Sequence, residues 1–142
     1  MDLDELTERM SMLCGTRLDE VTRASGLFSL RGEPVILLCL AHAGEALLSG
    51  ELTERCGLST GRVANLLRQL EAKGLIVRSG DEEDRRKTYV SLTEAGVREA
   101  RRQGERIASQ RKALLSYLGE RDAYEFVRLL ERCLDFCSVA AA

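Results

Sequence analysis

The chain has 142 residues, of which 44% are hydrophobic and 31% charged, with a formal net charge of −2. This balance fits one domain with a real core and excludes wholesale disorder. No stretch approaches the roughly 20 apolar residues of a membrane span. The acidic, amphipathic N-terminus is not a secretory or transit signal, so we expect a cytoplasmic protein without a membrane partner. Aromatic residues make up only 4% of the chain, which favours packed helices over a sandwich of strands.

Two helices are predicted before residue 45. Apolar residues recur at three-to-four spacing between Leu3 and Val21 and predict one amphipathic helix. A second, mostly apolar helix is predicted over residues 35–42. Pro34 suits its first turn, because the missing N–H of proline costs nothing there.

Residues 49–74 are typical of two short helices joined by a tight turn. Ser49 can cap the first helix, and Gly57 stands just past its end. Ser59 can cap the second, and Gly74 can stop it in a left-handed conformation. The inner face of the second helix follows the i, i+3, i+4, i+7 pattern, with Val63, Leu66, Leu67 and Leu70. This arrangement predicts a helix-turn-helix.

Two β-branched runs, at residues 75–79 and 87–92, flank a charged segment and predict a two-stranded hairpin. Thr93 can cap a long helix from Glu94 to about Tyr117, which Gly119 breaks. The last helix has one apolar stripe, formed by Val127, Leu130, Leu134 and Cys137. The predicted fold is therefore mostly α with a two-stranded β wing: a winged helix-turn-helix core between N- and C-terminal helices. The outer stripes lack partners in one chain and would most simply pack against a second copy.

The outward face of the predicted helix over residues 60–73 suits the major groove of DNA. Arginine can fork onto guanine, asparagine can bind adenine, and threonine can meet a thymine methyl. The helix N-terminus can also hold a phosphate. The candidate major-groove residues are Thr60, Gly61, Arg62, Asn65 and Arg68. Any solvated helix face could show such residues, so this helix alone leaves both interpretations open.

The charged segment between the predicted strands sets four acids before three bases. An arginine at the tip of a wing can enter the minor groove, where the negative potential is focused. A carboxylate two residues earlier can hold its guanidinium in a bidentate pair. Asp84 and Arg86 have this spacing. For Asp81, Glu82 and Glu83, a solvated loop is a sufficient interpretation.

After the helix that ends "LEAKGLI", the sequence reads Asp84-Arg85-Arg86, then "KTYVS", then Leu-Thr-Glu-Ala-Gly up to Gly96. This pattern resembles the wing signature of the MarR family of bacterial transcription regulators, Asp-x-Arg followed by a strand and Leu-Thr-x-x-Gly. The resemblance implies a homodimer that binds double-stranded DNA at a palindromic operator. Arg86 would be the minor-groove arginine, with Arg85 beside it and Asp84 as its orienter.

The resemblance also implies the roles of the remaining parts. Residues 1–32 would be an N-terminal dimerisation helix and loop, residues 33–96 the DNA-binding domain, and residues 97–142 the C-terminal dimerisation helices. Ser59 and Arg78 would contact phosphates, beside the major-groove residues named above. Members usually repress promoters and are released by a small ligand, often aromatic and acidic, or by cysteine oxidation or metal.

The cysteines leave an alternative open. Their odd number, without an export signal, argues against a disulfide framework. Cys39 and Cys56 are expected to be small core hydrophobes. The other three belong to the segments assigned to the dimer interface: Cys14, Cys133 and Cys137. A redox- or metal-sensing repressor is possible there, although helical packing explains these cysteines equally, and the tyrosines of the hydroperoxide-sensing branch are not evident around Cys14.

Enzyme chemistry is not indicated. There is no nucleophile–base pair, no Gly-rich phosphate loop and no pair of carboxylates on a rigid strand, so we expect neither an enzyme nor a cofactor. The single His42 closes the second helix and has no partner at metal-ligand spacing, so no metal site is predicted. The near-neutral charge and the acidic wing tip leave one other class of function open, a winged helix used only for protein–protein contact.

Overall fold

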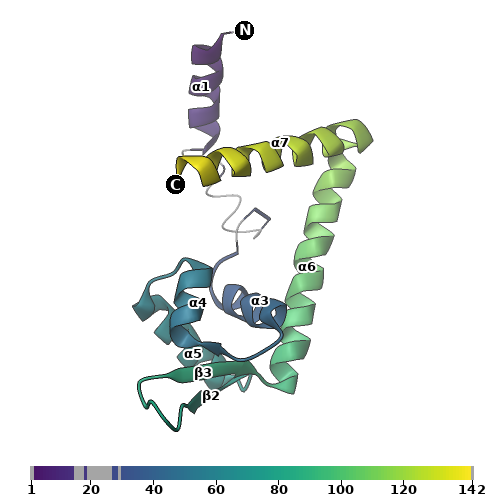
Figure 1. Ribbon diagram of the computed structural model, residues 1–142. Coiled ribbons are helices and arrows are strands. Elements are labelled where there is room, and N and C mark those ends of the chain that lie inside the picture. The colour runs from purple at the N-terminus through teal and green to yellow at the C-terminus, as the bar shows by residue number, and fades with distance from the viewer. Residues whose placement is uncertain (1, 15–17, 19–26, 29, 142) are drawn as a thin grey trace. The chain divides into compact units, whose positions relative to one another are not determined.

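The computed structural model describes residues 2–14, 18, 27–28 and 30–141 (Figure 1). The elements are α1 (Leu3–Met12), α3 (Glu33–Ala43), β1 (Leu47–Leu48), α4 (Ser49–Cys56), α5 (Thr60–Ala72), β2 (Ile76–Gly80), β3 (Thr88–Leu92), α6 (Glu94–Leu118) and α7 (Glu120–Ala140). The predicted mostly α fold with a β wing is confirmed. The chain divides into two units, Met1–Glu105 and Arg106–Ala142. The three functional segments proposed from the sequence stay a prediction.

The first helix begins directly after Asp2, and the second begins at Glu33, two residues before its predicted start. The Asp2 carboxylate accepts hydrogen bonds from the backbone N–H groups of Asp4 and Glu5, at 3.0 and 3.2 Å, and so begins α1. The span predicted for this helix continues to residue 21, but residues 15–17 and 19–21 lie outside the described residues. Pro34 stands in the first turn of α3, as predicted.

The helix-turn-helix is formed by α4 and α5. Gly57 ends α4 with a φ of 62°, a left-handed conformation that glycine adopts without strain. The predicted cap of α4 is wrong by one residue. Leu48 is the N-cap, its N–H donates to the Glu51 carboxylate at 3.2 Å, and the Ser49 hydroxyl donates to the Thr88 carbonyl at 3.4 Å. Because β1 ends at residue 48, residue 49 is already helical.

The sheet has three antiparallel strands in the order β1-β3-β2, whereas the sequence predicted two. Leu47 pairs with Val90 and Leu48 with Tyr89. Along the wing, pairing runs from Ile76 with Leu92 to Gly80 with Thr88. The extra strand is only two residues long, too short to show the alternation that identifies a strand in sequence.

One hydrophobic core holds the first unit, Met1–Glu105, together. It draws side chains from α3, α4, α5, α6 and all three strands, and each is at most 2% exposed: Ile36, Leu37, Leu40, Leu47, Leu52, Val63, Leu66, Leu67, Leu70, Ile76, Val90 and Ala100. The four positions predicted for the inner face of α5 are all in this core. The core therefore holds one face of α5 against α3, α4 and β2.

The start of α6 is tied to the turn between α5 and β2. The Thr93 hydroxyl accepts from the Gly96 N–H at 3.0 Å, which is the predicted cap, and donates to the Gly74 carbonyl at 2.6 Å. The Thr93 N–H donates to the Leu75 carbonyl at 3.1 Å. A Cβ on Gly96 would lie 1.9 Å from that carbonyl oxygen, so only glycine fits here.

Helix α6 ends at Leu118 and α7 begins at Glu120, so the chain breaks between them at Gly119, as predicted. Helix α7, which is described in full, has no buried residue. Large apolar side chains along it are at least 40% exposed: Tyr124, Val127, Leu129, Leu130, Leu134, Phe136 and Val139. Among the described residues, no helix is both long and apolar enough to cross a bilayer.

Candidate nucleic-acid interface

Helix α5 carries its predicted major-groove residues away from the core. Thr60, Gly61, Arg62 and Arg68 are exposed, and Asn65 is half-buried. The Ser59 hydroxyl accepts from the Arg62 N–H at 3.2 Å and caps the helix, as predicted. That hydroxyl can also donate its own hydrogen to a phosphate. The exposed face thus offers two guanidinium groups and a capped helix N-terminus.

The wing loop is closed by two of its own acidic residues. The Asp81 carboxylate accepts from the Glu83 N–H at 2.9 Å, and the Asp81 N–H donates to the Lys87 carbonyl at 3.0 Å. The Lys87 N–H in turn donates to the Asp84 carbonyl at 3.0 Å. Asp81 therefore shapes the loop, which is more than the solvated role that sequence reasoning gave it.

Asp84 contacts Arg86 through one carboxylate oxygen. This oxygen accepts from the backbone N–H of Arg86 at 3.0 Å and from its Nε at 3.4 Å. The expected bidentate pair is therefore replaced by a single-oxygen contact to both the main chain and the side chain. The Arg86 side chain remains 93% exposed, and the neighbouring Arg85 is exposed as well. Asp84 thus holds the backbone N–H and the Nε of Arg86, while the side chain extends into solvent.

Arg78, predicted to contact phosphate, is paired with Glu71 of α5. The Nε and one terminal nitrogen of Arg78 donate to the two Glu71 carboxylate oxygens, at 3.2 and 3.0 Å. These hydrogen bonds hold the pKa of Glu71 below its usual value and raise that of Arg78. Arg78 keeps further N–H groups for a phosphate. Sequence reasoning did not predict that Glu71 holds Arg78. The signal that could have indicated this pairing is the position of Glu71 in the last turn of α5, just before the turn into β2.

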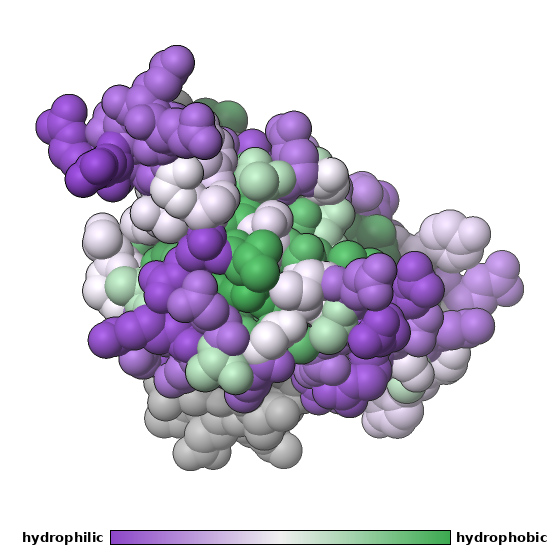
Figure 2. Space-filling view, turned by 90° about the horizontal axis from the view of Figure 1, so that it is seen from below, coloured by the Kyte–Doolittle hydropathy of each residue, from purple (hydrophilic) through white to green (hydrophobic). Residues whose placement is uncertain are grey.

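The face seen from below in Figure 1, where β2 and β3 lie, is not uniformly hydrophilic. Figure 2 shows a hydrophobic area on it, bordered by hydrophilic residues. A cavity of about 370 Å³ lies beside α5 and is lined by Ser49, Gly50, Thr53, Thr60, Val63, Ala64, Leu67 and Arg78. Polar groups are therefore available at the edges of this face and beside the recognition helix.

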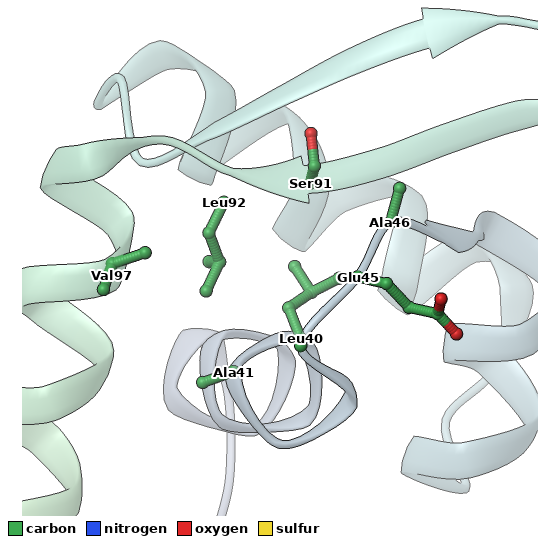
Figure 3. Close-up of a pocket in the computed structure, with 8 residues that line it drawn as sticks. Leu40, Ala41, Glu45, Ala46, Ser91, Leu92 and Val97 are labelled. Carbon is green, nitrogen blue, oxygen red and sulfur yellow. The ribbon is translucent and has the colours of Figure 1, made fainter.

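A second cavity, of about 270 Å³, lies between the end of α3, the end of β3 and the first turn of α6 (Figure 3). The apolar side chains of Leu40, Leu92 and Val97 converge on it, while the Glu45 carboxylate and the Ser91 hydroxyl point away.

The cysteines fall into two sets. Cys39 and Cys56 are half-buried and pack against the core, as predicted. The three candidates for a redox site, Cys14, Cys133 and Cys137, are exposed. Within the described part of the chain, no three His, Cys, Asp or Glu side chains are grouped so as to hold a metal ion. His42 is exposed in the last turn of α3.

Comparison with known proteins gives a family model, described as the MarR family, that matches residues 31–87. The uncharacterised HTH-type transcriptional regulator YfiV of Bacillus subtilis (strain 168) is 30% identical over 129 residues, which cover 89% of this chain and 80% of that protein. The segment that the family model matches, residues 31–87, contains α3, the helix-turn-helix and the wing loop.

Solved structures agree on the fold. The PcaV transcriptional regulator from Streptomyces coelicolor, in complex with its natural ligand, has a TM-score of 0.67 at 25% identity, over 95% of this chain and 96% of that chain. Streptococcus pneumoniae FabT in complex with DNA has a TM-score of 0.69 at 19% identity, over 98% and 99% of the two chains.

Proposed function

Because the chain belongs to the MarR family of DNA-binding transcriptional regulators, we propose that it is a homodimeric repressor of a palindromic operator and that a small ligand releases it. Membership of this family argues against a winged helix that makes only protein contacts, and against an enzyme. In the proposal, α5 lies in the major groove and the wing reaches the adjacent minor groove.

The observation that carries the proposal is that Arg86 is anchored to Asp84 and yet exposed to solvent. Its main chain and Nε are both anchored to Asp84, while the side chain is 93% exposed at the end of the wing. An arginine tethered at its base and extended into solvent has no structural task within the described unit. It is suited to a narrow minor groove, whose negative potential attracts a guanidinium.

The polar groups around α5 support the same placement. Arg62 and Arg68 are exposed on a helix whose opposite face is buried, so a base edge can approach them without disturbing the core. Gly61 leaves open space around the first turn of the helix. Ser59 and Arg78 flank this region and suit phosphates, which fix the register of a protein on the duplex.

The exposed apolar face of α7 supports the homodimer. Leu134 is 60% exposed and Phe136 is 74% exposed, and α1 likewise exposes Leu6 and Met10. Faces of this kind are covered in stable proteins, because each large apolar side chain gains about 1.5–3 kcal/mol from full burial. A two-fold dimer presents two identical reading heads, and it therefore fits a palindromic site.

A third cavity, of about 590 Å³ and open to solvent, supports a small acidic effector. It is lined by α3 and the first turns of α6, with Leu38, Ala41, His42, Val97, Ala100, Arg101 and Gly104. Most of the lining residues are apolar, and the Arg101 guanidinium can meet a carboxylate. PcaV has been solved with its natural ligand, and NadR, a structural relative at 20% identity and a TM-score of 0.55, with 4-hydroxyphenylacetate.

The test is selection of random duplexes by the purified protein, followed by affinity measurements on the recovered sequence. We expect a palindromic consensus and an affinity that falls steeply with salt. Arg86→Ala removes two wing contacts per dimer, each worth about 1–3 kcal/mol, so affinity should drop at least about thirtyfold. Arg98→Ala, which removes the same charge from the exposed side of α6, is the matched control and should change affinity little.

Two outcomes would contradict the proposal. Recovery of no consensus would refute sequence-specific binding, and equal affinities of Arg86→Ala and Arg98→Ala would refute the wing assignment.

Leu134→Glu tests the dimer: sedimentation should show a monomer, whereas Asp135→Asn on the polar face of α7 should remain dimeric. Arg101→Ala should abolish release of the DNA by aromatic acids without weakening DNA binding itself.

A further inference from the structure

The last turn of α5 places an acid beside an arginine of the predicted DNA interface. Glu71 accepts two hydrogen bonds from Arg78 of β2, from Nε at 3.2 Å and from a terminal nitrogen at 3.0 Å, one on each carboxylate oxygen. Both side chains stay partly open to solvent, with 31% of Arg78 and 43% of Glu71 exposed. Ion pairs this accessible contribute little to stability, so stability gives little reason for an acid beside a surface that binds a polyanion.

Both ends of the pair are anchored by the core. Glu71 directly follows Leu70, which is fully buried in the inner face of α5. Arg78 pairs in the sheet with Val90, which is also fully buried. Because both backbones are held, the bidentate ion pair fixes the direction of the guanidinium relative to the recognition helix.

The pairing leaves donors of Arg78 available. Glu71 binds Nε and one terminal nitrogen, so the other terminal nitrogen keeps its N–H groups for a further acceptor. Arg78 also lines the cavity of about 370 Å³ beside α5, together with Thr60 at the start of that helix and Ser49 and Thr53 of α4. The guanidinium is therefore ordered and still able to bind a phosphate.

We propose that Glu71 is a positioning residue of the DNA interface, which orders Arg78 for one operator phosphate and thereby increases sequence specificity. This role rests on the phosphate contact proposed above for Arg78. Immobilising a free, rotamer-rich side chain costs about two- to tenfold in affinity, and an arginine that is already held avoids most of this loss. Phosphate contacts of fixed geometry set the register of a protein on the duplex.

The charge of Glu71 has the opposite effect on non-specific binding. Non-specific affinity grows with the number of phosphates that the protein neutralises. An acid acts over about 8–10 Å at physiological salt, so a carboxylate bonded to a phosphate-binding arginine repels the same backbone. Glu71 therefore favours the operator in two ways: it orders a contact that needs the correct register, and it weakens attraction that needs none.

The test compares Glu71→Gln with Glu82→Gln, which removes the same charge from the wing loop. Affinity is measured at one salt concentration for the duplex recovered by selection and for a scrambled duplex of equal length. Glu71→Gln should weaken binding to the recovered duplex by about fivefold or more per dimer, with binding to the scrambled duplex unchanged or stronger. Glu82→Gln should weaken neither. A purely structural role of Glu71 would weaken both alike, and a purely electrostatic role would strengthen both.

A double-mutant cycle with Arg78→Ala separates order from charge. Arg78→Ala should weaken binding and reduce the salt slope by about two per dimer, since each protomer loses one phosphate contact. In that background Glu71→Gln only removes an acid, so affinity for the recovered duplex should stay equal or rise. Urea unfolding midpoints of all variants should lie close to that of the original chain, because the pair is exposed.

Each result decides a different claim. Unchanged or tighter binding of Glu71→Gln to the recovered duplex overturns the positioning role. An equal loss in the presence and absence of Arg78 also overturns it, because Glu71 would then act by another route. An unchanged salt slope for Arg78→Ala overturns the phosphate contact on which the role rests. If the original chain selects no duplex, the proposed function itself fails, and the positioning role fails with it.

Discussion

Among the described glycines, Gly96 is the one where an added Cβ would meet backbone most closely, and its replacement gives a sharp test of the structure. In Gly96→Ala, the new Cβ would lie 1.9 Å from the Leu75 carbonyl oxygen, 3.0 Å from the Leu75 carbonyl carbon and 3.2 Å from the Leu92 Cδ2. Carbon atoms pack at about 3.5–4.0 Å, so α6 or the α5–β2 turn must move by more than about 1 Å. The obstacle is backbone, which cannot rotate away as a side chain can.

The cost follows from what the movement disturbs. Overpacking of a filled site costs about 1–3 kcal/mol. The Leu75 carbonyl also accepts from the Thr93 N–H at 3.1 Å, and loss of that hydrogen bond costs about 0.5–1.5 kcal/mol. We therefore expect Gly96→Ala to lower the free energy of unfolding by about 2–4 kcal/mol, a large share of the stability of a domain.

Gly104→Ala, eight residues further along the same helix, is the matched control. Its Cβ would meet only the Leu38 Cδ2 at 3.6 Å, an ordinary contact. Alanine in a helix interior is favoured over glycine by about 0.5–1 kcal/mol, so this variant should be slightly more stable than the original chain. Urea unfolding followed by circular dichroism, at one protomer concentration, measures both. Equal midpoints for the two variants would show that Gly96 is not confined as described.

Three further predictions concern α5, α6 and the core. Gly61→Ala should leave the unfolding midpoint unchanged or raise it, since nothing lies within 4 Å of its Cβ position, yet weaken operator binding in a gel-shift assay; unchanged affinity would place this turn away from the duplex. Hydrogen bonds from Arg102 and Gln103 lower the pKa of Glu99 to about 2, so its stabilising effect is present above its unfolded pKa of about 4.3 and is lost as pH falls towards 2. Glu99→Gln should therefore flatten the stability profile between these values, and an unaltered profile would refute the pairing. Leu70→Ala removes a fully buried side chain and should cost about 2–5 kcal/mol in the same urea assay; a loss below 1 kcal/mol would contradict its place in the core.

Most of the DNA-binding unit could be predicted because its signals are local. The cap at Ser59, the four apolar positions of α5 and the stop at Gly74 lie within sixteen residues, and helix geometry links them directly. The wing followed from two short β-branched runs around a charged turn. The position of Arg86 near Asp84 was also local, because the two residues are only two apart in sequence.

What the sequence could not supply depends on contacts between distant segments. The pairing of Glu71 with Arg78 depends on how sharply the chain turns between α5 and β2. Strand β1 exists because β3 offers it a partner, and its two residues carry no pattern of their own.

These contacts explain how a chain with a net charge of −2 is suited to DNA. The acids near the predicted interface have internal tasks: Glu71 holds Arg78, Asp84 holds Arg86, and Asp81 closes the wing loop. Each carboxylate fixes the direction of a cation or a loop and offsets part of the positive charge. The non-specific part of DNA binding, which grows with the number of phosphates neutralised, is thereby kept small. In the proposed complex, contacts to base edges and to the minor groove then supply a larger share of the affinity than they would for a strongly basic domain, beside the phosphate contacts proposed for Ser59 and Arg78.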